Sequence, residues 1–518
     1  TLSPQQAASD AELRRLVGRE LSLEPESIHS IQVRRRNIDA RQRRILVNLT
    51  LDVYLEGEAP AVDDFSDLVY PDVSSSPQAV VVGAGPCGLF AALRLIELGV
   101  RPFVVERGQD VMQRRKDLVQ LEKTGLVDPE SNYSFGEGGA GAFSDGKLYT
   151  RSRKRGSVEK ILRVFCRFGA DPKILVDAHP HIGTDKLPII IRRMREQILA
   201  SGGEVHFGCR MEELLLERGE VRGIVTADGR SFTGPVLLAT GHSARDVYRY
   251  LHGAGVLIEA KPIAVGVRLE HPQQLIDQIR YHSPEGRGAY LPAAEYVYKA
   301  QVGGRGVYSF CMCPGGFVVP ASTGPEETVV NGMSPANRGS RWANSGMVVE
   351  LHPEDIPETS IAVEDPTSPL ALMHWCQEFE RRSYIAAECS LRAPAQRMTD
   401  FVKGRFSQSL PSSSYSMGLT PSALHEWMPH FVAQRLTEGF RAFDRSTRGF
   451  LTEEAQLIGV ESRTSSPVRI PRDRETYCHP VVTGLYPAGE GAGFAGGIVS
   501  AAIDGENAAQ QIALALGR

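Results

Sequence analysis

The sequence predicts an α/β protein built on a doubly wound, largely parallel sheet, and three consecutive features support this prediction. The apolar run at residues 79–82 is typical of a strand buried on both faces of a parallel sheet. The glycine-rich stretch GAGPCG follows at 83–88 and leads into apolar residues at helical spacing over 89–98. A second apolar run, 103–105, then ends at Glu106. A GxGxxG stretch in this setting of strand, turn and helix indicates a dinucleotide-binding site.

Each position of this turn has a physical role. Gly83 permits a tight turn, Gly85 lets the backbone approach a pyrophosphate, and Gly88 lets the helix pack against the strand. The helix N-terminus then faces the phosphate charge. Glu106 is placed to accept hydrogen bonds from a ribose, and its carboxylate would repel a 2′-phosphate. Three more residues are predicted to contact the dinucleotide: Pro86, Cys87 and Arg107.

Composition narrows the class of protein. At 518 residues the chain is too long for one hydrophobic core, and its length predicts about three domains. A net charge of -4 gives no reason to expect nucleic-acid binding, and 8 scattered cysteines without a CxxC pair favour reduced thiols over structural zinc. No membrane span or signal pattern is present, so we expect a cytoplasmic protein. Because the chain begins at Thr1, an organelle stroma or matrix stays open.

Residues 1–75 predict a small module of their own. Ser9 and Glu12 have the spacing of a capping box before a helix, and apolar residues alternate at 45–53 as in a half-buried strand. A shorter strand is expected at 28–33. Between the two strands lies a cationic cluster, which is either a solvated hairpin end or a contact for an anionic partner. The cluster comprises Arg34, Arg35, Arg36, Arg41, Arg43 and Arg44.

The same fingerprint serves FAD and NAD, and three further stretches bear on the choice. Residues 237–241 predict a strand that ends in a small-residue turn. Residues 485–498 predict a strand that delivers Glu490 and a glycine-rich turn to a terminal helix, which suits ribityl hydroxyls and an anionic ring edge; a second phosphate loop is the alternative. Residues 135–146 hold five glycines, so a flat ring could lie against the backbone, with a mobile loop as the alternative.

In this order, the stretches resemble the FAD-binding fold of the glutathione reductase and p-hydroxybenzoate hydroxylase type. More narrowly, the chain resembles the uncharacterised FAD-dependent dehydrogenases labelled NAD(FAD)-utilising dehydrogenases over roughly residues 20 to 518. The matching segments are SFGEGGAGAFSDGKL, HIGTDKL, TGHSARD, GVRLEHP, FCMCPGGFVV, ESRTSSPVRI and GEGAGFAGGI. The resemblance implies bound FAD in a Rossmann-like doubly wound sheet, with an inserted α+β substrate domain and a small N-terminal α+β domain.

The resemblance also assigns places to residues along the cofactor. Gly83, Gly85 and Gly88 would lie at the pyrophosphate and Glu106 at the adenosine ribose. Further contacts would come from Met211 near the adenine, Thr240 and Gly241 beside the dinucleotide, Gly489 and Glu490 along the pyrophosphate and ribityl chain, and Gly497 and Ile498 at the pyrimidine edge. The implied domains are 1–75, then 79–249 and 456–518 for FAD, with the substrate domain at 250–455.

Six side chains are candidates for catalysis or substrate binding. Cys311 and Cys313 would share one face of a strand and could form a thiol relay, unless they are ordinary buried apolar residues. His242 and His479 are candidate proton donors, with capping and packing roles as the alternatives. Arg463 and Arg469 could hold a substrate carboxylate or form structural ion pairs. No metal-ligand pattern is present.

These features predict an FAD-dependent oxidoreductase that exchanges hydride with a small-molecule substrate at flavin N5. The chain has no second dinucleotide fingerprint, so NAD(P)H would dock in the substrate cleft, or a protein would act as electron donor. The alternative is an FAD-binding protein with a regulatory, assembly or RNA-related role through its arginine-rich N-terminal module. A flavin thiol oxidoreductase that uses the two cysteines is a third hypothesis.

Overall fold

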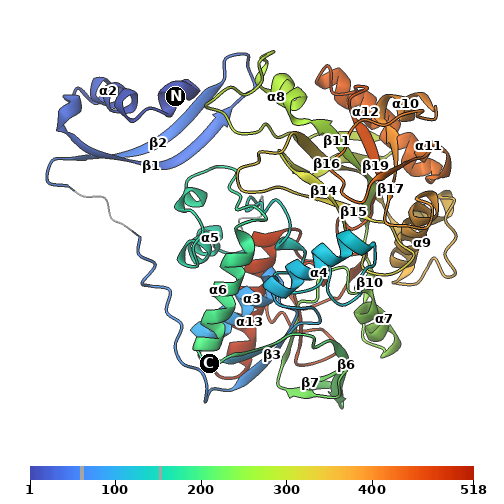
Figure 1. Ribbon diagram of the computed structural model, residues 1–518. Coiled ribbons are helices and arrows are strands. Elements are labelled where there is room, and N and C mark those ends of the chain that lie inside the picture. Colours follow the sequence, from blue (N-terminus) through green and yellow to red (C-terminus); the bar gives the residue numbers. More distant parts are fainter. Residues whose placement is uncertain (59–62, 151–154) are drawn as a thin grey trace.

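The computed structural model describes residues 1–58, 63–150 and 155–518. A small N-terminal unit lies beside two larger units, each of which is built around one sheet (Figure 1). We call the unit around the parallel sheet the first domain and the unit around the larger, mostly antiparallel sheet the second domain. Chain segments from both ends of the sequence meet in the first domain, where strand β3 (Gln78–Val82) and helix α13 (Ile498–Ala515) lie close together.

The first domain contains a parallel sheet in the order β21-β9-β3-β4-β5. Its other strands are β21 (Leu485–Pro487), β9 (Val236–Leu238), β4 (Arg101–Val105) and β5 (Glu204–His206). Helices α3 (Pro86–Glu97), α13 and α6 (Leu187–Ala200) pack on one face, and the antiparallel strands β6 (Met211–Glu217), β7 (Glu220–Thr226) and β8 (Ser231–Thr233) cover the other. Residues 79–82 are buried, as expected for a central strand covered on both faces. The predicted Rossmann-like α/β fold class is confirmed.

The second domain contains a seven-stranded sheet in the order β12-β13-β16-β11-β19-β17-β18. These strands are β12 (Lys299–Val302), β13 (Arg305–Cys313), β16 (Trp342–Leu351), β11 (Ile263–Pro272), β19 (Gln456–Glu461), β17 (Ala393–Arg397) and β18 (Leu419–Pro421). Since β19 pairs with β11 and β17, this domain extends beyond residue 455, where the sequence suggested its end. Apolar side chains of β19 enter the same core as helix α12 (His430–Ser446), which the sequence pattern alone did not reveal.

Helices and short strands surround the two sheets. Helices α8 (Gln273–Tyr281), α9 (Ala371–Ala386), α10 (Met398–Lys403), α11 (Leu424–Trp427) and α12 (His430–Ser446) belong to the second domain, and α4 (Val111–Thr124), α5 (Val158–Arg167) and α7 (Arg245–Gly253) to the first. Short strands pair as β10 (Glu259–Ala260) with β20 (Val468–Arg469), and β14 (Phe317–Pro320) with β15 (Val330–Met333). Gly303 and Gly304 form the turn between β12 and β13, so they open no dinucleotide-binding helix.

The N-terminal unit consists of helices α1 (Pro4–Ala7) and α2 (Asp10–Leu21) beside a hairpin of β1 (Ile28–Asp39) and β2 (Leu46–Leu55). Ser9 caps α2 by accepting a hydrogen bond from the Glu12 amide. Strand β1 is longer than expected, so Arg34 to Arg36 lie within it. Two backbone hydrogen bonds attach Arg36 to the first domain, from its N–H to the Val176 carbonyl and from the Ala178 N–H to its carbonyl.

The contact between α3 and α13 yields a stability prediction. A methyl group on Gly505 would lie 2.1 Å from the Cys87 carbonyl oxygen, so Gly505→Ala must push the two helices apart. We expect a loss of about 1–3 kcal/mol in the free energy of unfolding, measured by urea denaturation. The matched control is Gly253→Ala in α7, where the methyl group meets nothing within 4 Å. A similar loss in both variants would contradict this explanation.

Candidate functional site

A cavity of about 360 Å³ lies where the carboxyl ends of β3, β4 and β9 face the second domain. Its volume falls in the range of small-molecule binding sites. Most residues that the sequence pattern singled out line it: Gly83, Gly85, Pro86, Cys87, Glu106, Arg107, Met211, Thr240, Gly241, His242, Cys311, Glu490, Gly497 and Ile498. Four others lie outside its lining: Gly88, Gly489, Cys313 and His479.

The glycines of the 83–88 turn divide into two kinds. Methyl groups on Gly83 and Gly88 would lie 2.4 Å from the Ala239 carbonyl oxygen and 1.9 Å from the Gly83 carbonyl oxygen, so both positions serve close backbone packing. Gly85 is different, because its methyl group would come no closer than 3.9 Å to another atom. It is also the N-cap of α3 and offers no side chain to the helix amides. The turn therefore leaves room and unpaired N–H groups for an anion at this point.

Glu106 ties three backbone segments together. One carboxylate oxygen accepts the Ala84 N–H at 2.9 Å. The other accepts the N–H groups of Gly108 at 2.9 Å and Gly136 at 3.0 Å. The side chain is buried at the wall of the cavity. Its role at a ribose remains a prediction, and the carboxylate retains lone pairs that could accept one more donor.

The glycine-rich loop at 135–146 is held by an arginine that the sequence pattern did not reveal. Arg114, in α4, is fully buried, and its guanidinium donates to the carbonyls of Asn132, Glu137 and Gly139 at 2.8–2.9 Å. Nothing in a helical sequence distinguishes this arginine from solvated neighbours. The loop is therefore fixed by a buried cation along the cavity wall.

The second glycine-rich turn, at 489–497, is fixed by a buried ion pair. The Gly489 N–H donates to Asp504 Oδ2 at 2.7 Å, and Asp504 pairs with Arg472 at 2.5 Å. Gly497 is the N-cap of α13 with no side-chain cap, and a methyl group there would meet nothing within 4 Å. Two helix N-termini, those of α3 and α13, thus border one cavity.

Glu490 and His242 form a titratable pair in the cavity, with 3.9 Å between Glu490 Oε1 and His242 Nε2. Burial and the neighbouring Cys311 sulfur raise the pKa of Glu490 to about 7. Burial and nearby cations, Arg463 first among them, lower the pKa of His242 to about 4. The imidazole is therefore neutral near pH 7, so the prediction of His242 as a ready proton donor does not fit, and Glu490 holds the proton instead.

Cys311 and Cys313 contact each other through their thiols, but only Cys311 lines the cavity. The pairing of β13 with β16 shifts between Phe310 and Cys313, and Cys311 has a φ of 44°. This irregularity breaks the alternation of side chains, so Cys311 lines the cavity while Cys313 is buried behind it. A hydrogen bond from the Cys313 thiol, together with the Lys147 and Arg268 cations, lowers the pKa of Cys311 to about 5.

Arg268 fixes this bulge from within the second sheet. It is fully buried, donates to the Cys311 carbonyl at 2.7 Å, and pairs with Glu461 at 3.0 Å. Lys147, from the first domain, donates to the Met312 carbonyl. Cations from both domains therefore converge on the backbone around Cys311.

His479 has a structural role in the chain. Its Nε2 is 3.0 Å from the Leu257 carbonyl oxygen, and its Nδ1 accepts the Val481 and Val482 amides. Both ring nitrogens are used and the residue does not line the cavity. His479 therefore has the packing role and not the role of a proton donor.

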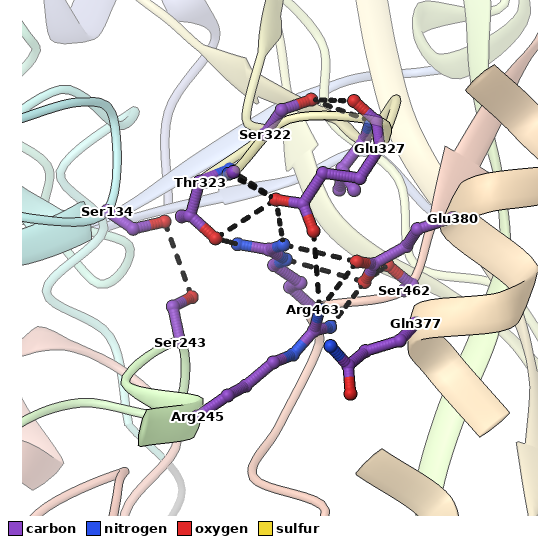
Figure 2. A network of polar contacts seen from close by, with 12 residues as sticks. Ser134, Ser243, Arg245, Ser322, Thr323, Glu327, Gln377, Glu380, Ser462 and Arg463 are labelled. Atoms are coloured by element: carbon purple, nitrogen blue, oxygen red, sulfur yellow. Dashed lines mark hydrogen bonds and ion pairs between the residues drawn. The ribbon is translucent and has the colours of Figure 1, made fainter. Parts of the chain in front are cut away.

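Arg463 belongs to a buried ion network between the domains (Figure 2). Glu380 accepts two hydrogen bonds from Arg245 at 2.6 and 2.8 Å, and Arg463 pairs with it at 3.2 Å. Glu327 pairs with Arg463 at 2.8 Å and with Arg245 at 3.4 Å. Of the two alternatives for Arg463, the structural ion pair is present. Arg469 is exposed, and its guanidinium lies over the Phe494 ring at 5.4 Å.

Three segments of the chain match known domain families. Residues 262–464 match "FAD-dependent protein, C-terminal domain-like" and residues 77–124 match "FAD binding domain". Residues 1–54 match a domain of unknown function, DUF8436. An uncharacterised protein of Clostridium beijerinckii is 38% identical over 519 residues, which cover 96% of this chain and 95% of that protein.

Solved structures show weaker similarity. Tetracycline destructase Tet(51) is 10% identical with a TM-score of 0.34, covering 86% of this chain and 83% of its own. CtdE in complex with FAD is 11% identical with a TM-score of 0.32, covering 84% and 88%. The flavin-dependent brominase Bmp2 is 10% identical with a TM-score of 0.38, covering 85% and 79%.

The domain families and the cavity define a flavin-dependent enzyme of the Rossmann-like α/β class, with FAD as its cofactor. The chain belongs to the same family as the uncharacterised Clostridium beijerinckii protein. The cavity fits FAD, because its open glycines and two uncapped helix N-termini suit a pyrophosphate and an electron-rich ring edge. Among the described residues, no group of side chains could hold a metal ion, and no helix is long and apolar enough to cross a membrane.

The open space at Gly85 predicts a variant that loses FAD while keeping its fold. Gly85 has a φ of -76°, which alanine adopts without strain, and the added methyl group would project into the cavity. We expect Gly85→Ala to bind FAD at least about tenfold more weakly, with an unchanged urea denaturation curve for the apoprotein. FAD affinity is measured by titrating the apoprotein. Wild-type affinity in this variant would show that the pyrophosphate does not approach Gly85.

The raised pKa of Glu490 predicts a pH-dependent stability. The folded protein keeps the Glu490 proton up to about pH 7, whereas the unfolded chain releases it near the ordinary glutamate pKa of 4.5. Glu490 therefore destabilises the apoprotein progressively as pH rises through this window. We expect Glu490→Gln to be more stable than wild type at pH 8 by on the order of 1–3 kcal/mol, and equal at pH 4.

Denaturation of the apoprotein across this pH range measures the difference. Glu217→Gln on β6 is the control, since that side chain is 73% exposed. A constant difference between Glu490→Gln and wild type at all pH values would contradict the raised pKa of Glu490.

Proposed function

We propose that this protein is an FAD-dependent oxidoreductase of the dehydrogenase or reductase type, acting on a small molecule bound between the two domains. The proposal rests on one observation: a single cavity extends from the first domain to the second. Its lining runs from Glu490, Gly497 and Ile498 in the first domain to Phe310 and Cys311 in the second. A substrate on the second-domain side would lie beside the redox-active end of the cofactor.

The chain's own residues bind and orient the cofactor. The amides at the start of α3 hold the pyrophosphate beside Gly85, and those at the start of α13 face the electron-rich ring edge beside Gly497. Glu106 and Arg114 keep the intervening loops in place. Bound FAD supplies hydride exchange at N5.

In this proposal, Glu490 supplies the proton. Its carboxyl oxygen holds a proton near neutral pH, and an acid whose pKa lies near the working pH transfers protons most effectively. His242 lies 3.9 Å away, and its pKa, lowered to about 4, leaves the proton on Glu490. Arg463 is already paired with Glu327 and Glu380, so a substrate carboxylate would compete with two internal ones there.

The regulatory or RNA-related alternative receives less support from the N-terminal unit. Arg34 Nε pairs with Asp52 at 2.5 Å, and Arg41 pairs with Asp39 at 2.6 Å. The backbone of Arg36 is bonded to the first domain. The cationic cluster is therefore partly neutralised within the chain and partly packed against it.

The test is the visible spectrum of the FAD-loaded protein during anaerobic addition of NADH or NADPH. We expect one of these donors to bleach the flavin band, because hydride transfer reduces the ring directly. The same donor should also bleach the flavin band of the Cys311→Ser variant, because direct hydride transfer requires no thiol. Dithionite serves as the control that the bound flavin can be reduced. A band that only dithionite bleaches would contradict a pyridine-nucleotide donor, and loss of bleaching in Cys311→Ser with FAD retained would favour the thiol relay.

A further inference from the structure

A second, larger cavity lies where the N-terminal hairpin meets the two domains. It has a volume of about 860 Å³ and lies between three segments: residues 36–41 of the hairpin, residues 177–181 of the first domain, and residues 280–297 of the second. We call it the hairpin cleft. The N-terminal unit thus contributes a wall to a cavity that neither domain forms alone.

Most charges in the hairpin cleft are paired with each other. Asp39 pairs with Arg41 at 2.6 Å. Glu295 pairs with His179 at 2.5 Å and with Arg338 at 3.9 Å. These pairs leave little net charge at their part of the wall.

Two partly buried arginines of the hairpin cleft are not neutralised in this way. Within the part of the chain that the structure describes, the guanidinium groups of Arg36 and Arg280 form no ion pair or side-chain hydrogen bond. The Nε atom of Arg280 is buried without a partner. Asp177 lies opposite Arg36 in a β-bridge, and among the described residues no ion pair joins the two side chains. A buried N–H group without an acceptor is costly, and a bound anion that accepts from Arg280 Nε would remove that cost.

A thin partition separates the hairpin cleft from the FAD cavity. Lys147 forms a β-bridge with His181, and the Tyr149 and His179 rings stack with 5.0 Å between their centroids. Lys147 and Tyr149 line the FAD cavity, whereas His179 and His181 line the hairpin cleft. The two cavities are therefore one layer of side chains apart.

We propose that the hairpin cleft is a binding site for a phosphorylated small molecule, with its phosphate held by Arg36 and Arg280. A single guanidinium satisfies a carboxylate, whereas two on different walls suit an anion with three terminal oxygens. The cleft is much larger than a phosphate group, and the half-exposed Tyr290 offers a flat surface to the organic part. This proposal does not depend on the redox reaction proposed above.

The experiment uses the full-length, FAD-loaded protein, so that FAD already occupies its own site. Pyrophosphate and ADP are the probes, titrated by isothermal calorimetry. We expect at least one probe to bind, and we expect Arg36→Gln and Arg280→Gln each to weaken that binding about tenfold or more. Glutamine keeps much of the side-chain length and removes the charge.

Arg35→Gln is the matched control, because Arg35 is an exposed arginine on the same strand that does not line the hairpin cleft. Its affinity for the probe should stay within about twofold of wild type. FAD content and thermal unfolding, measured on every variant, identify any loss of fold. The proposal is overturned if neither probe binds the wild-type protein, or if folded Arg36→Gln and Arg280→Gln variants bind as wild type does.

Discussion

Three backbone amides meet at the Glu106 carboxylate, and the geometry of the FAD site depends on them. These amides belong to the glycine turn before α3, to the residue two positions after Glu106, and to the glycine-rich loop at 135–146. Hydrogen bonds to a charged acceptor contribute about 1.5–3 kcal/mol each. One side chain at the end of β4 therefore fixes the distance between the turn and the loop, and with it the width of the cavity.

The second domain organises its side of the site by the same means, with a buried charge acting on backbone atoms. Arg268 anchors the bulge at Cys311 and is itself neutralised by Glu461 from β19. Because β19 lies between β11 and β17, the position of Cys311 depends on the centre of the sheet rather than on its edge. The cysteine at the cavity is thus placed by a rigid support, while its partner Cys313 stays behind the wall.

The local parts of the site could be predicted from the sequence, and the parts made by distant segments could not. The strand, turn and helix at 78–97 follow from apolar burial and from glycine positions that are adjacent in the chain. The bulge at Cys311 depends on Arg268, and the loop at 135–146 depends on Arg114, so neither has a signal in its own segment. The hairpin cleft combines residues near 36, 180 and 290, which no pattern in a single sequence brings together.

The ion network of Arg245, Glu327, Glu380 and Arg463 has a consequence for how molecules enter and leave. Arg245 begins α7 in the first domain, whereas Glu380 lies in α9 of the second (Figure 2). Separating the domains would break both of the pairs that Arg245 forms, with Glu380 and with Glu327, and would expose the charges to water. Entry by local side-chain movements keeps these pairs intact, so the network favours that route over domain rotation.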